Sequence, residues 1–305
     1  MRVETCPPEV LAGIADLDLV ARIIVEGLVS GLHRSPFHGY SAEFSQYRHY
    51  RPGDDLKYVD WKLVARTDRL YTKQFRETTN VASAIVLDTS ASMNFPTARL
   101  KPRATSADVA QDFSLAKFRY AVIAAAALAH LISGQGDAIG LLAGDRFQPP
   151  RAGRQHLRGL LAALSSLHPA GSWSVADNVR RASERLKRRG LLLVFSDFYD
   201  DEDRTLAELR RASRMGHEVM LFQVLSREEI ELPYRRDLEL TDLESGRSLV
   251  INAGLARRDY KDAVAAFLER WHGRAGAEGF QYSLIVTDTP PERALRNVLL
   301  ARGHR

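Results

Sequence analysis

The spacing of hydrophobic residues changes several times along the chain, and each change predicts an element of secondary structure. Between residues 8 and 31 apolar side chains recur with a period near 3.6, as at Leu17, Val20 and Ile24, which predicts a helix. Unbroken apolar runs indicate strands that are buried on both faces of a sheet. Such runs occupy residues 81–88, 190–197 and 217–225.

Further segments alternate between strand and helix patterns as far as the C-terminus. The predicted helices cover residues 113–133, 155–167, 175–188, 203–214, 255–271 and 291–300, and two more strands cover 138–144 and 280–287. Two short strands are expected within residues 237–251, with a turn at Glu244–Arg247. Alternating strands and helices predict a Rossmann-like α/β fold with a mostly parallel central sheet between helices.

The first 80 residues have a different pattern. After the predicted helix, residues 31–55 are rich in glycine, proline and histidine, which favours turns, and residues 70–75 alternate like a strand. We therefore predict a small N-terminal module over residues 1–80 and an α/β domain over residues 81–305.

Composition and charge narrow the class of protein. The chain has 305 residues, 45% of them hydrophobic and 27% charged, which is typical of a globular protein. Its one cysteine, Cys6, excludes an internal disulfide and fits a reducing compartment. The longest apolar helical run, residues 120–132, is too short to cross a bilayer, and the N-terminus does not read as a signal peptide. We expect a cytoplasmic protein without a membrane span.

The net charge of +5 comes mainly from arginine. The densest clusters, residues 180–189 and 208–214, have helical spacing and lack interleaved aromatic residues. This pattern favours solvated helix faces over a nucleic-acid-binding patch, so no nucleic-acid partner is expected.

The most informative motif is IVLDTSASM, residues 85–93. Asp88, Ser90 and Ser92 follow the first buried strand at a spacing of two, and Asp197 ends the second. In open parallel sheets ligands bind at the carboxyl ends of the strands, near the point where strand order reverses. Carboxylate and hydroxyl oxygens suit a hard cation, best Mg²⁺, with Mn²⁺ as an alternative. The simpler interpretation, a helix N-cap, uses the same residue types.

Asp88 could also be a catalytic residue of an enzyme. An aspartate after the first strand of such a sheet can be a phosphoryl-accepting nucleophile, which makes a phosphate-processing hydrolase the alternative function. The usual second aspartate two residues later is replaced here by Ser90, which cannot act as a general acid. The sequence also has no nucleophile elbow, phosphate loop or zinc-protease motif. We therefore predict a binding protein and no enzyme.

The D-x-S-x-S motif resembles the metal-ion-dependent adhesion site of von Willebrand factor type A domains, over about residues 80–305. That resemblance implies a Mg²⁺ held by Asp88, Ser90 and Ser92, by a second-loop threonine and by Asp197, with a partner's carboxylate completing the octahedron. The second loop departs from the pattern, because AGSWSVAD (170–177) has no threonine. Ser174, or Ser172, would supply the hydroxyl, and Trp173 would stand in the threonine's place. A metal-free scaffold is a third possibility.

The N-terminal segment resembles the signature of domain of unknown function family 58. The matching residues are Gly39, Glu43, Phe44, Arg48, Tyr50, Gly53, Asp54, Asp55, Asp60, Trp61, Lys62, Ala65, Arg66 and Thr67. The resemblance covers essentially the whole chain. It implies that the protein is an adaptor for a MoxR-type AAA+ ATPase and binds a client protein through an acidic side chain.

The charges of this segment also have a purely structural interpretation. Arginines and aspartates between residues 48 and 66 are numerous enough for an ion-pair network around a turn, and Trp61 is expected to pack as an anchor. The alternative is a docking surface beside the metal face.

Overall fold

The structure is a computed structural model. It describes residues 14–29, 42–51, 54–55, 59–77, 82–96, 115–234 and 237–303, without the side chains of 29, 42–46, 73–77 and 301–303. The predicted first helix begins at Leu17 within these ranges, and its expected portion before residue 14 lies outside them.

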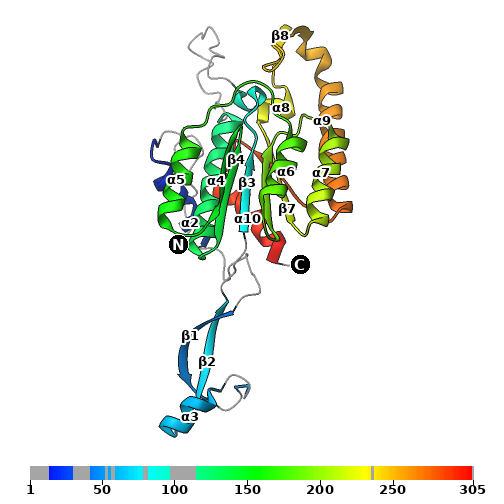
Figure 1. Cartoon of the computed structure of the whole chain (residues 1–305). Helices are drawn as coiled ribbons and strands as arrows, with labels where there is room; N and C mark the ends of the chain where they lie inside the picture. Colours follow the sequence, from blue (N-terminus) through cyan, green and yellow to red (C-terminus); the bar gives the residue numbers. More distant parts are fainter. Residues whose placement is uncertain are drawn as a thin grey trace.

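A six-stranded sheet forms the centre of the molecule (Figure 1). Its strands are β3 (Ala82–Leu87), β4 (Ala138–Ala143), β5 (Arg146–Arg151), β6 (Gly190–Ser196), β7 (Glu218–Leu225) and β10 (Gln281–Val286). Their spatial order is β10-β7-β6-β3-β4-β5, and all neighbours are parallel except the edge pair β4–β5. Chain order therefore reverses between β3 and β6, so the switch point lies between these two strands. The predicted α/β fold class is confirmed.

Helices cover both faces of this sheet (Figure 1). Alternate residues of each strand point to opposite faces, so that Ile85 and Leu87 join one core and Ala84 and Val86 the other. The first core is closed by α2 (Leu17–Val29), α4 (Lys117–Gly134), α5 (Arg154–Ser165) and α10 (Pro291–Gly303). The second is closed by α6 (Val175–Arg185), α7 (Glu202–Arg214) and α9 (Ala253–Ala277).

Helix α2 belongs to the first of these cores, although we assigned it to the N-terminal module. Val20, Ile24 and Leu28 are at most 1% exposed and pack in the same cluster as α4. The part of the chain that lies apart is β1 (Ala42–His49), α3 (Trp61–Thr67) and β2 (Tyr71–Glu77). Figure 1 shows this unit beyond the edge at which the parallel strands begin.

The N-terminal unit is an antiparallel hairpin with internal polar contacts. The Arg48 guanidinium donates to both oxygens of Asp54, at 2.7 and 2.8 Å, which confirms one part of the expected ion-pair network. Asp60 accepts the N-terminal amides of α3 and a hydrogen bond from the Tyr47 hydroxyl. The expectation that Trp61 packs as an anchor is wrong. Trp61 is the first residue of α3, and it is 60% exposed.

The position of the N-terminal unit contradicts the alternative expectation that it forms a docking surface beside the predicted metal residues. The unit lies at the opposite edge of the sheet from the ends of β3 and β6 (Figure 1). The pattern did not predict β1, α3 or β5, and it also did not predict two short helices, η2 (Ala91–Asn94) and α8 (Arg227–Glu231). Within the described residues, no helix is both long and apolar enough to cross a membrane.

A second hairpin, β8 (Asp237–Thr241) and β9 (Ser248–Asn252), confirms the two predicted short strands. It precedes α9 and follows the short helix α8 (Arg227–Glu231). In Figure 1 it lies near the edge where the parallel strands end.

Candidate metal centre

The loop after β3 begins with Asp88, which is 3% exposed. Its amide continues the sheet by donating to the Phe195 carbonyl at 2.9 Å, which fixes its backbone against β6. The carboxylate accepts from the Ser90 amide at 2.8 Å and from the Ser196 hydroxyl at 2.6 Å. The side chain is therefore held above the switch point by both strands that flank it.

The two serines of the motif continue from this carboxylate toward Asp197. Ser90 Oγ lies 2.8 Å from Ser92 Oγ, and the Ser92 hydroxyl donates to Asp197 Oδ2 at 2.9 Å. A short 3₁₀-helix, η2 (Ala91–Asn94), turns the chain here and buries Met93 beneath the loop. The structure thus brings Asp88, Ser90, Ser92 and Asp197 together, as their positions at two strand ends predict.

Asp197 is positioned by an unusual turn at the end of β6. Phe198 has φ of +59°, a left-handed conformation that costs a non-glycine residue about 1–3 kcal/mol. The buried Phe198 ring packs against Trp271, with ring centroids 4.8 Å apart, and its amide donates to Ser196 Oγ. The Asp197 carbonyl accepts from the Gln223 amide group at 2.8 Å. Core packing therefore holds the strained turn that directs the carboxylate to the sheet edge.

The second loop is tied to the first through the backbone. The Ala91 amide donates to the Gly171 carbonyl at 2.8 Å, and the Ala170 amide donates to the Thr89 carbonyl at 2.9 Å. Gly171 has φ of +67°, which suits glycine. Ser174 caps α6 with its side chain, accepting weakly from the Asp177 amide at 3.4 Å.

A buried lysine that the sequence did not point to reaches the same acids. Lys117, at the start of α4, is 1% exposed, and its ammonium donates to Asp197 Oδ2 at 2.8 Å and to Glu229 Oε1 at 2.6 Å. Glu229 uses its other oxygen in a capping box with Ser226. Burial disfavours the charged lysine, but the two carboxylates outweigh burial and raise the pKa of Lys117. One ammonium thus neutralises part of the acidic charge.

These loops enclose a small cavity of about 210 Å³. Serines from both loops line it, together with Trp173, Tyr199 and four carboxylates. Two of the carboxylates are Asp88 and Asp197, and the others are Asp200 and Glu244. Trp173 has a buried indole N–H without a hydrogen-bond partner among the described residues. Both Ser172 and Ser174 line the cavity, so the structure leaves both hydroxyls as candidate ligands.

The crowding of acids changes their protonation. Burial, and then the charge of Asp197, raise the pKa of Asp88 from 3.8 to about 7. Burial also raises the pKa of Glu244, and the charges of Asp197, Asp242 and Asp200 act in the same direction, while a hydrogen bond with Ser92 opposes them. A divalent cation in this cavity would reverse these effects, because it favours the ionised carboxylates.

The oxygen positions are compatible with a small hard cation. Neighbouring ligands of an octahedral Mg²⁺, bound at about 2.0–2.1 Å, lie about 2.9 Å apart. The separations from Ser90 Oγ to Ser92 Oγ and from Ser92 Oγ to Asp197 Oδ2 are 2.8 and 2.9 Å. In the described part of the chain, no group of three His, Cys, Asp or Glu side chains is arranged to hold a metal. A cation here would therefore need the serine hydroxyls and water.

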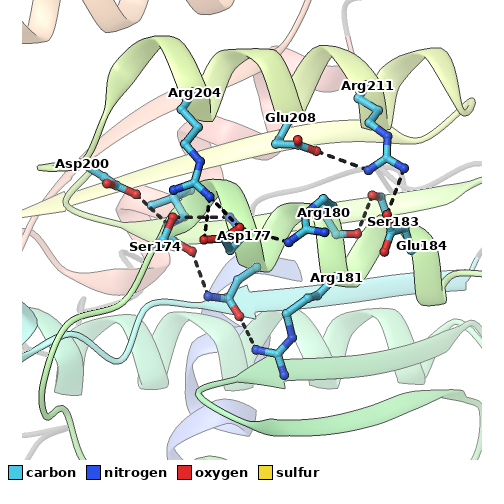
Figure 2. A network of polar contacts seen from close by, with 12 residues as sticks. Ser174, Asp177, Arg180, Arg181, Ser183, Glu184, Asp200, Arg204, Glu208 and Arg211 are labelled. Atoms are coloured by element: carbon cyan, nitrogen blue, oxygen red, sulfur yellow. Dashed lines mark hydrogen bonds and ion pairs between the residues drawn. The ribbon is translucent and has the colours of Figure 1, made fainter.

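Figure 2 shows the polar network that supports the second loop from the α6 and α7 side. Asp200 accepts from the Val175 amide at 2.9 Å, which links the third loop to the start of α6. Asp177 accepts from Arg204 of α7 at 2.8 and 2.9 Å, and Arg211 donates to Glu184 at 2.9 Å. Arg180, Arg210 and Arg211 of the two basic clusters pair with carboxylates and stay partly exposed, as expected of solvated helix faces.

Five further residues of the site were not predicted from the sequence: Lys117, Ser196, Asp200, Glu229 and Glu244. The polar run SDFYDD could have indicated Ser196 and Asp200, because both lie close to Asp197 in the chain. Lys117, Glu229 and Glu244 come from segments far from the motif, and nothing in their local pattern indicates that they meet it.

Comparisons with known proteins agree with the resemblance seen in the N-terminal segment. The family described as "Protein of unknown function DUF58" matches residues 46–269. Uncharacterized protein Rv1480 of Mycobacterium tuberculosis (strain ATCC 25618 / H37Rv) is 32% identical over 279 residues, which cover 87% of this chain and 81% of that protein.

Two solved structures are also similar. The conserved hypothetical protein BatB of Bacteroides thetaiotaomicron shares 16% identity with a TM-score of 0.45, covering 74% of this chain and 100% of that chain. A von Willebrand factor type A protein of Catenulispora acidiphila shares 13% identity with a TM-score of 0.37, covering 76% and 44% of the two chains. From the family match and the mycobacterial relative, we conclude that the chain belongs to the DUF58 family.

Proposed function

We propose that the cavity at the switch point binds Mg²⁺, with Mn²⁺ as a substitute, and that the bound ion captures an acidic side chain of a partner protein. Asp88, Ser90 and Ser92 would hold the ion, with Ser174 and Asp197 completing the protein's contribution. When bound, the ion supplies a positive centre for a carboxylate. The observation that carries this proposal is that Asp88, Ser90, Ser174 and Asp197 line one cavity. The Ser92 hydroxyl is tied to this group, 2.8 Å from Ser90 Oγ and 2.9 Å from Asp197 Oδ2.

The wall of the cavity adds surface that an acidic partner can contact. Trp173 lines the cavity, but its indole N–H is buried and lacks a partner within the described residues, which costs about 1–3 kcal/mol. The indole must therefore turn before this N–H can donate to an oxygen of the incoming carboxylate. Exposed Tyr199 and Leu243, 48% and 40% accessible, provide apolar contact area near the third loop and on the β8–β9 turn.

Titration calorimetry with Mg²⁺ and Mn²⁺ on metal-stripped protein tests the proposal. Asp88→Asn keeps the size of the side chain and removes its charge, so we expect saturable binding to be lost or weakened at least about tenfold. Asp145→Asn is the matched control, because Asp145 follows β4 at the same sheet edge and is exposed. A folded wild type that binds neither ion would contradict the proposal and indicate a scaffold in which Lys117 alone balances the acids.

We further propose a MoxR-type AAA+ ATPase as the partner, which the family resemblance suggests. Co-purification of the two proteins, with wild type and with Asp88→Asn, tests this without removing the Mg²⁺ that an ATPase itself needs. Binding that is lost in the variant supports capture through the cavity. If wild type and Asp88→Asn bind the ATPase equally well, the contact lies outside the cavity. A phosphatase assay with generic phosphate esters, with no turnover expected, addresses the hydrolase alternative.

A further inference from the structure

The turn between β8 and β9 places a carboxylate at the cavity, although it is separated from the D-x-S-x-S motif by about half of the chain. Glu244 lines the cavity beside Asp88, Ser90 and Asp197, and it shares a hydrogen bond with the Ser92 hydroxyl. This is the type of group that the proposed function assigns to a partner protein. The chain itself therefore presents the chemistry that the cavity is proposed to bind.

The turn that carries Glu244 is built by its neighbours. Asp242 accepts from the Glu244 amide at 2.9 Å and from the Ser245 hydroxyl, and Gly246 has φ of +71°. The Asp242 amide donates to the Arg247 carbonyl at 2.8 Å, which closes the turn. The side chain of Glu244 takes no part in these turn contacts and is directed to the cavity. Its replacement should therefore leave the hairpin intact.

The position of Glu244 is electrostatically unfavourable in the absence of a cation. It adds a fourth carboxylate to a cavity that Asp88, Asp197 and Asp200 already line. Two like charges 4 Å apart would repel by about 1 kcal/mol in bulk water and by about 4 kcal/mol near a protein surface. A divalent ion between these groups converts the repulsion into shared attraction.

We propose that Glu244 is an internal ligand of the site: once the serine hydroxyls and aspartates hold an ion, its carboxylate turns onto the coordination position that a partner's acidic side chain takes after the β8–β9 hairpin is displaced. No three acidic side chains among the described residues are arranged to hold an ion beforehand, so the ion itself must draw Glu244 in. The inference rests on the proposed metal-dependent function. It adds the β8–β9 turn to the ligand set, as a fourth segment after the loops that carry Asp88, Ser174 and Asp197. Partner binding then becomes an exchange of one carboxylate for another.

The hairpin has the features of a segment that can be displaced. Leu240 and Leu249 pair across its strands on one face and are 38% and 63% exposed, and Val250 on the other face is 71% exposed. Its base is held by an Asn252 side chain that donates to Asp237 at 2.6 Å and caps α9. Little apolar surface is therefore lost from the core when its tip moves.

Mn²⁺ provides a direct test, because water-proton relaxation reports how many exchangeable waters a bound Mn²⁺ carries. Glu244→Ala should carry more water on each bound Mn²⁺ than wild type, giving a higher relaxivity per bound ion, and should bind the ion about tenfold more weakly. Glu239→Ala is the matched control, since Glu239 lies on β8 of the same hairpin and does not line the cavity. Thermal unfolding of both variants verifies the fold.

The outcomes separate the two proposals. Wild type that binds no Mn²⁺ overturns the metal site and the internal ligand together. Wild type that binds Mn²⁺, with Glu244→Ala unchanged in both affinity and relaxivity, overturns the internal ligand and leaves the metal site standing. A change in Glu244→Ala that Glu239→Ala does not share supports the internal ligand.

Discussion

Replacing Lys117 with methionine tests whether buried charge balance holds the candidate site together. Methionine keeps the length and apolar character of the side chain but removes an ammonium that lies 2.8 Å from Asp197 and 2.6 Å from Glu229. The lysine is 1% exposed, so water has no access to replace it. Breaking a buried ion pair by removing one partner costs about 3–5 kcal/mol. We expect a loss toward the upper end, because two carboxylates lose the same cation.

Urea unfolding followed by circular dichroism, at pH 7.5 in the presence of a chelator, measures this loss. Lys187→Met is the control, since Lys187 is exposed beyond the end of α6 and its replacement should change the free energy of unfolding by less than about 0.5 kcal/mol. A loss below about 1 kcal/mol for Lys117→Met would place the contact in the range of surface ion pairs and refute the reasoning.

The same variant also tests the relation between Lys117 and the proposed cation. Both positive charges would lie near Asp197, so removing the ammonium should tighten Mg²⁺ binding. At a free concentration of 100 times its dissociation constant, Mg²⁺ would then restore about 2.7 kcal/mol of the lost stability. A folded variant that binds Mg²⁺ more weakly than wild type would show that the two charges do not compete.

Two further predictions concern proton binding and backbone packing. In metal-free protein the contribution of Asp88 to the free energy of unfolding should fall by at most about 4 kcal/mol as the pH rises from about 4 to about 7, because native Asp88 (pKa about 7) keeps a proton that the unfolded side chain releases near 3.8. Urea titrations across this range should show a flatter profile for Asp88→Asn, and parallel profiles would contradict the assignment. Gly190→Ala should destabilise the protein by at least about 1–3 kcal/mol, because its Cβ would clash with the Ala82 carbonyl oxygen. Gly159→Ala, where a Cβ meets nothing within 4 Å on α5, is the control and should be neutral or slightly stabilising in the same thermal or urea assay.

The central sheet was predictable because its strands are unusually apolar. Buried on both faces, β3, β6 and β7 read as continuous hydrophobic runs, and the helices between them keep a clear period. The exception is β5, whose sequence RFQPPR carries two prolines that argue against a strand. It forms because it is an edge strand, where a missing backbone donor can be tolerated.

The site was predictable only where its residues follow strand ends. Asp88 and Asp197 could be paired from the sequence because each ends a buried strand, and the structure shows that these strands, β3 and β6, are neighbours. Lys117 lies at the start of a helix whose pattern is otherwise apolar, and its charge is explained only by acids 80 and 112 residues away. The prediction that Trp61 packs as an anchor was wrong because the sequence does not show whether a neighbouring surface exists to cover a large aromatic side chain.

The charge inventory of the site constrains how it would recognise a partner. Asp88, Asp197, Asp200 and Glu244 line the cavity, and Lys117 balances only part of their charge. At neutral pH the remaining charge is reduced either by a proton on Asp88 or, in the proposed function, by a divalent ion, so the two compete for one carboxyl group. Exchange of Glu244 for a partner's carboxylate leaves the net charge unchanged. Electrostatics alone therefore gives the partner no advantage over the internal ligand, and the preference must come from what the partner's other side chains contact, such as exposed Tyr199 near the third loop.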